Sequence, residues 1–213
     1  TTFSWSRDKL VEVPANPGMI AASGTGNISG NLFNNTNSNQ VVTFTITATA
    51  AGCASTTTTS TITVKPTPTI AISNSSQTIC SATAIANMAI SNPNNVAGTT
   101  YTWSRDNTAL VTGIANSGSS SGPFSISGTL ANSNGGTQTT TFTIIATANG
   151  CSSTSTSTVT VYAPLVVPVI GNSQDVCNTQ TPAAFYMSTP VTGGSGSYTY
   201  QWQRSAVNAN LWS

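Results

Sequence analysis

The chain has 213 residues, enough for about two domains of 100 residues, and five basic and four acidic side chains give it a formal net charge of +1. Only 4% of residues are charged, where a soluble domain has roughly 25%, and 39 Thr, 30 Ser and 21 Asn supply the polar surface instead. This composition excludes the basic patch that binds nucleic acid, a polybasic membrane-binding segment and an acidic calcium site.

The chain has no histidine, so it lacks the commonest general base and metal ligand. Its four acidic residues are isolated along the sequence, and no serine has a histidine to activate it. We therefore predict no catalytic residues, no cofactor and no metal site. No apolar run approaches the roughly 18 residues of a membrane-spanning helix, so no membrane insertion is predicted either.

The first predicted strand is TTFSWSRD at 1–8, in which alternation places Phe3, Trp5 and Arg7 on one face. The same octet returns as TTYTWSRD at 99–106, and a third version is YTYQWQR at 198–204. Mid-strand tryptophans between an aromatic residue and an arginine are typical of a sandwich core rather than of a sugar-stacking surface. The predicted core tryptophans are Trp5, Trp103 and Trp202, and the arginines Arg7, Arg105 and Arg204 are expected to keep their guanidinium groups in water.

Two Thr-rich strands joined by an Asn-Gly or Gly-Cys hairpin follow each of the first two tryptophan strands. Phe44 and Phe142 point inward, into the predicted core. Exposed β-branched residues favour a pleated sheet, which explains the outward threonines without a ligand. The alternative is a surface that binds glycan or ice, made by Thr57, Thr59, Thr61, Thr63, Thr154, Thr156, Thr158 and Thr160.

The repeat length of 97 to 99 residues is that of an immunoglobulin-type sandwich, and Pro-containing joints follow Lys65 and Ala163. We predict an all-β fold of tandem immunoglobulin-like antiparallel sandwiches in a linear array. Residues 1–66 are the C-terminal part of a first repeat, 67–163 a complete repeat, and 164–213 the N-terminal part of a third, divergent repeat. We expect the chain to be a piece of a longer array of repeats.

Each repeat places one cysteine after the hairpin and one beyond the Pro-rich joint, which favours an oxidising compartment. We expect a Cys80–Cys151 disulfide, on the argument that the first strand of a sandwich begins where its last hairpin turns. Cys53 and Cys177 would then pair with cysteines beyond these residues. Metal binding is the disfavoured alternative, because the cysteines are not clustered.

These motifs resemble the PKD-like and immunoglobulin-like repeats of giant surface proteins of the Bacteroidota, exported by the type IX secretion system, including gliding-motility adhesins. The shared pattern is an aromatic-x-Trp strand, a Thr-rich strand ending in AxGC, a second one closing in TVTV, and a QxxC segment. In the third repeat Trp212 takes the place of the second tryptophan of a sister repeat type. The resemblance implies an extracellular, rod-like array on the outer surface of a Gram-negative cell.

The expected function is a non-catalytic stalk or filament segment of a repetitive adhesin, which holds an adhesive or motility tip away from the cell. Its expected partners are neighbouring repeats of the same chain, other copies of the chain by lateral association, and a surface or glycan. The alternatives are a glycan- or ice-binding module and an accessory region of a secreted enzyme.

Overall fold

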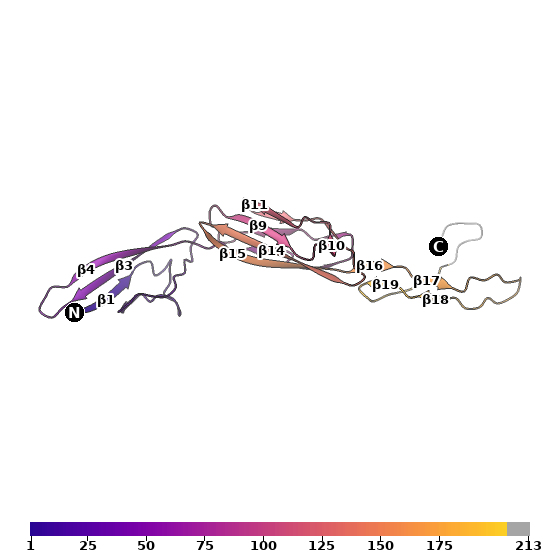
Figure 1. Cartoon of the computed structure of the whole chain (residues 1–213), viewed down its shortest axis with the longest axis horizontal. Helices are drawn as coiled ribbons and strands as arrows, with labels where there is room; N and C mark the ends of the chain where they lie inside the picture. Colours follow the sequence, from indigo (N-terminus) through magenta and orange to yellow (C-terminus); the bar gives the residue numbers. More distant parts are fainter. Residues whose placement is uncertain (204–213) are drawn as a thin grey trace.

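The computed structural model describes residues 1–203, and every regular element in that part of the chain is a β-strand. The chain forms three successive bodies that follow one another along a line, with the N-terminus at one end and the third body at the other (Figure 1). The predicted all-β class is confirmed.

The middle repeat is a β-sandwich whose main sheet has the strand order β11-β9-β14-β15-β6. Neighbouring strands of this sheet are antiparallel except for β6 and β15, which run parallel. The bounds are β6 (Ser76–Ile79), β9 (Thr100–Arg105), β11 (Ser117–Ser120), β14 (Gln138–Ala148) and β15 (Cys151–Val161).

Two short sheets cover the inner face of this main sheet, with the orders β12-β8-β5 and β10-β13-β7. Their strands are β5 (Ala71–Ile72), β7 (Thr83–Ala84), β8 (Met88–Ser91), β10 (Val111–Thr112), β12 (Phe124–Ile126) and β13 (Thr129–Asn132).

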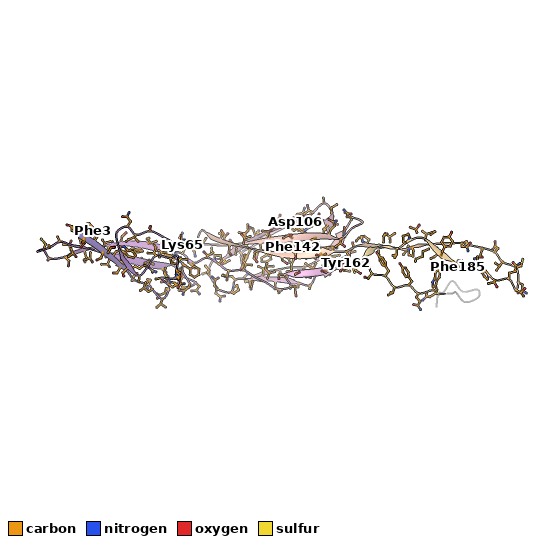
Figure 2. The ribbon with its side chains drawn as sticks, turned by 90° about the horizontal axis from the view of Figure 1, so that it is seen from below. Phe3, Lys65, Asp106, Phe142, Tyr162 and Phe185 are labelled. Atoms are coloured by element: carbon orange, nitrogen blue, oxygen red, sulfur yellow. The ribbon has the colours of Figure 1, made fainter. Side chains whose placement is uncertain are left out.

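The core of the middle repeat lies between these layers, because alternate residues of the long strands are apolar. Phe142, Ile144 and Ala146 of β14 are fully buried, and Tyr101 of β9 packs against Phe124 with ring centroids 5.6 Å apart. Phe142 lies inside the middle body in Figure 2.

The first body repeats the main sheet in the order β2-β1-β3-β4. Phe44 is buried in it, and Trp5 packs against Phe44. Phe3, however, is 56% exposed, whereas its counterpart Tyr101 is 1% exposed, because no second sheet within residues 1–66 covers Phe3. The strands are β1 (Thr2–Arg7), β2 (Ser23–Thr25), β3 (Gln40–Thr49) and β4 (Thr56–Val64).

In its described residues the third body consists of two strand pairs, β16 with β19 and β17 with β18. Trp202 is 65% exposed, so its prediction as a core residue is wrong. The reason is that no packed sheet of the described third body covers it. Arg204 and Trp212 lie outside the described residues. The strands are β16 (Ala163–Val166), β17 (Val169–Gly171), β18 (Tyr186–Thr189) and β19 (Thr192–Gly194).

The predicted Cys80–Cys151 disulfide is also wrong. Ile79 lies beside Val161 in the parallel β6–β15 pair, so Cys80 lies beyond the last residue of β15, whereas Cys151 is its first. Eleven residues of extended chain span roughly 36 Å, and a disulfide needs Cα atoms within about 7 Å. The chain does enter the sandwich at the hairpin end, where Ser153 Oγ donates to Pro68 O, but Cys80 follows β6 at the opposite end. All four cysteines are free thiols.

Candidate functional site

The candidate surface in the first repeat is the outer face of its sheet, which we call the hydroxyl face. Thr57, Thr59, Thr61 and Thr63 on β4 are all exposed. Three of them lie directly opposite threonines of β3, in the pairs Thr57–Thr47, Thr59–Thr45 and Thr61–Thr43. The face is therefore a regular array of neutral hydroxyl and methyl groups.

The middle repeat has a matching hydroxyl face on β14 and β15. Thr154 and Thr156 are exposed, whereas Thr158 and Thr160 are half-buried. The difference arises because β6 flanks the latter two on their other side. Thr160 also lies within hydrogen-bond distance of Thr139, with 3.3 Å between the two Oγ1 atoms. Such groups donate and accept hydrogen bonds, but they hold no charge and move no proton at neutral pH.

The recurring arginine is buried, which corrects the prediction of a solvated guanidinium. Arg105 is 7% exposed and Arg7 is 6% exposed. Arg105 Nη1 donates to Val111 O at 2.7 Å, and Nη2 donates to Ile114 O at 2.8 Å. Its Nε donates to the carbonyls of Ile114 and Ala115, both at 3.1 Å. The guanidinium thus satisfies the carbonyls of the loop that follows β9.

Arg7 makes the same contacts in the first repeat, donating to the carbonyls of Val13, Ile20 and Ala21. Burial lowers the pKa of both arginines below its ordinary value, and the neighbouring aspartates, Asp8 and Asp106, oppose this shift by Coulombic attraction. The recurrence of these contacts shows that the arginine organises a loop rather than a ligand site.

Each aspartate that follows the arginine joins two neighbouring strands. Asp106 accepts a hydrogen bond from the backbone N–H of Thr141 at 2.6 Å, and Asp8 accepts one from that of Thr43 at 2.7 Å. These carboxylates are therefore occupied by backbone contacts.

Two of the three predicted core tryptophans lie over a glycine of the adjacent strand. Trp5 is opposite Gly24, and Trp103 is opposite Gly118. A Cβ atom on Gly118 would lie 2.6 Å from Trp103 Nε1, so the ring covers the glycine closely. Trp5 is 9% exposed and Trp103 is half-buried against Phe142. Both rings pack against a phenylalanine of the core, which favours a structural role over stacking on sugars.

One structural residue escaped the sequence analysis, the buried asparagine at positions 34 and 132. Asn132 Nδ2 donates to Gly136 O at 2.8 Å and to Val161 O at 3.0 Å, which ties a loop to the end of β15. Asn34 makes the equivalent bonds to Ser38 O and Val64 O. The shared offset of 98 residues was the signal that could have revealed it.

Within residues 1–203, no group of three or more His, Cys, Asp or Glu side chains is placed to hold a metal ion. In the same part of the chain, no helix is long and apolar enough to cross a membrane.

The two successive sheets share the order of four strands, the arginine contacts and the buried asparagine, and they define a tandem repeat whose middle copy is a β-sandwich. A family model described as "PKD-like domain" matches residues 1–68 and 77–164. The chain belongs to this PKD-like domain family.

No curated protein matches the chain. Among solved structures it is similar to a chimeric titin Z1Z2–Z1Z2 tandem functionalized with a GRGDS peptide from fibronectin. The two share 16% sequence identity with a TM-score of 0.28, over 76% of this chain and 83% of the titin chain. The PKD-like family match and the internal repetition of the chain fit a structural repeat role.

Proposed function

We propose that this chain is a non-catalytic stalk segment of a repetitive adhesin on the outer surface of a bacterial cell. It holds an adhesive or motility tip at a distance from the cell. Its partners are the neighbouring repeats of the same chain.

The path of the chain through the middle repeat supports this proposal most directly. The chain enters beside the β14–β15 hairpin, where Ser153 Oγ donates to Pro68 O at 2.6 Å. It leaves after Val161, at the opposite end of β15 (Figure 1). A repeat with its entry and exit at opposite ends adds its full length to an array, which is what a spacer requires.

The joint between the first and middle repeats is short and held by contacts. Pro66 and Pro68 are both buried, and Pro restricts the backbone far more than Gly or Ser does. Lys65 Nζ donates to Asn149 O at 2.9 Å, across the joint labelled by Lys65 in Figure 2. These contacts support a joint that fixes the orientation of one repeat relative to the next.

The scarcity of charge supports a shaft whose shape is independent of pH and salt. With five basic and four acidic side chains and no histidine, the chain has few charged groups whose interactions pH or salt could change. The uncharged hydroxyl faces, which lack the lysines that usually guard sheet surfaces and edges, support lateral association of several shafts.

Small-angle X-ray scattering of the 213-residue chain tests the proposal. A compact chain of this length has a radius of gyration of about 17 Å. A stalk segment gives a value well above this, at both 50 mM and 1 M NaCl. A value near 17 Å, or one that collapses with added salt, contradicts the stalk function.

A further inference from the structure

The two cysteines of the middle repeat lie at opposite ends of its long axis. Cys151 begins β15 at the hairpin end, which faces the first repeat. Cys80 follows β6 at the other end, in an open groove that Leu165 and Tyr198 of the third repeat also line. Both side chains reach the surface, Cys80 being exposed and Cys151 half-buried.

The joint between the first and middle repeats shows where a hairpin cysteine lies relative to the repeat before it. The hairpin turn contacts the end of the first repeat through the Lys65 Nζ–Asn149 O bond, two residues before Cys151. The start of β15, from Ser153 to Ser155, shares a surface groove with Lys65 and Asn34 of the first repeat.

Internal repetition locates the counterpart of Cys80 at that same joint. In the middle repeat, the segment containing Cys80 is fixed on two sides. The Tyr162 N–H donates to Ile79 O at 2.9 Å, and the Asn132 N–H donates to Ser81 Oγ at 3.0 Å. The positions equivalent to Tyr162 and Asn132 in the first repeat are Lys65 and Asn34.

By this equivalence, the counterpart of Cys80 in the repeat before a hairpin lies beside Lys65, which donates to the hairpin of the next repeat, and beside Asn34, which lines the groove shared with β15. At the joint between the middle and third bodies, Tyr162 is the equivalent of Lys65, and it lies at the end of the middle body next to the third body (Figure 2). The hairpin of a following repeat would approach Cys80 there.

We propose that consecutive repeats are joined by a disulfide between Cys80 of one repeat and the residue equivalent to Cys151 in the next. The two thiols lose two protons and two electrons as the S–S bond forms. A disulfide oxidant, either a small-molecule disulfide or that of an oxidoreductase, accepts the electrons by exchange and leaves as two thiols. The cross-link fixes each joint covalently.

The test uses the 213-residue chain with a second copy of residues 67–163 inserted after residue 163. This chain has six cysteines, and Cys80 of the first copy faces Cys151 of the second. After equilibration in a glutathione redox buffer, alkylation under denaturing conditions and mass spectrometry count the free thiols. We expect four alkylated thiols without reduction, six after reduction, and a monomeric mass.

Single Cys→Ser variants identify the bond, because the copies yield identical peptides. Cys80→Ser in the first copy, or Cys151→Ser in the second, removes the disulfide. The same substitutions in the other copy are matched controls and leave it intact. Six free thiols, a bond that survives Cys80→Ser in the first copy, or a cross-link between separate chains each overturns the proposal. The outcome is independent of the stalk function, since it requires only that repeats follow one another.

Discussion

At the scale of single residues, the buried arginine shows how this chain uses one of its few charges. The guanidinium has a fixed, planar set of donors, and in both repeats these donors meet carbonyls of the loop after the arginine strand. Removing them would leave buried carbonyls without partners, which costs more than the hydrogen bonds themselves contribute.

We expect Arg105→Lys to destabilise the middle repeat by about 2–4 kcal/mol, because an ammonium cannot reach the carbonyls of Val111, Ile114 and Ala115 together. Urea unfolding of the full chain measures the loss. Thr102→Ala, at an exposed position of the same strand, is the control and shifts the midpoint little. Equal midpoints for the two variants would contradict the role of the guanidinium.

Tyr101 has a buried hydroxyl that finds no hydrogen-bond partner in residues 1–203. Burial raises its pKa above the usual 10.0, so the unfolded chain releases this proton before the folded chain does. The stability that depends on the neutral phenol is therefore complete below pH 10 and is lost as the pH rises further.

Tyr101→Phe is expected to raise stability at pH 7 by up to about 1 kcal/mol, because it removes an unpaired polar group. It should also reduce the loss of stability above pH 10. Urea unfolding at pH 7 and pH 10.5 tests both effects, with Tyr162→Phe as the control at a half-buried site. A large loss at pH 7 would show that the hydroxyl has a stabilising partner.

Gly118 leaves room for the ring of Trp103, which lies over it. In Gly118→Ala, the new methyl group meets Trp103 Nε1 at 2.6 Å and displaces a ring that packs on Phe142. We expect a loss of about 1–3 kcal/mol and a changed tryptophan emission in the folded state. Gly122→Ala, where no atom lies within 4 Å, should change neither quantity.

At the scale of elements, a glutamine holds β6 of the middle repeat in place. Gln77 Oε1 accepts from the Ala86 N–H at 2.7 Å, and its Nε2 donates to Ala86 O and Asn74 O, both at 3.0 Å. Gln174 contacts Ala183 and Asn172 in the same way in the third body. The side chain therefore acts as a backbone clamp between two segments nine residues apart.

Gln77→Ala should destabilise the middle repeat by about 1–2 kcal/mol, because the Ala86 amide loses its acceptor. Hydrogen exchange should show faster exchange at Ala86 than in the unmodified chain. Thr78→Ala, exposed on the same strand, is the control. Unchanged protection of Ala86 would contradict the clamp.

The strands themselves were predictable from alternation. Phe44 and Phe142 recur at inward positions of long period-two segments, and both are buried. Alternation also places the hydroxyl-face threonines outward, because a strand has only two faces. The exposed fraction of Phe3 was not predictable, since it depends on whether a second sheet lies over that face.

The wrong predictions about the cysteines and the arginines share a physical cause. Both features depend on how segments that are distant in the sequence pack together. To predict the disulfide, one would have to know at which end of the sandwich Cys80 lies. The parallel register of β6 on β15 determines this. The arginine prediction required the shape of the loop whose carbonyls surround the guanidinium. Neither the register nor the loop shape follows from local alternation.

At the scale of the whole molecule, the joint sets how straight the chain is. In the double variant Pro66→Gly and Pro68→Gly, the linker gains backbone freedom, so we expect a smaller radius of gyration by X-ray scattering. Pro17→Gly makes the same chemical change in an exposed loop within the first repeat and should leave the radius unchanged. An unaltered radius in the double variant would show that side-chain contacts alone fix the joint.

The parallel pairing of β6 with β15 determines how the middle repeat responds when its two ends are drawn apart. Tension entering at Pro68 pulls β6 one way, and tension leaving after Val161 pulls β15 the other way. The ladder from Ser76–Thr158 to Ile79–Val161 is then loaded in shear, so its hydrogen bonds must rupture together rather than peel open one by one. The fold thereby opposes extension most strongly along the axis on which the repeats are strung.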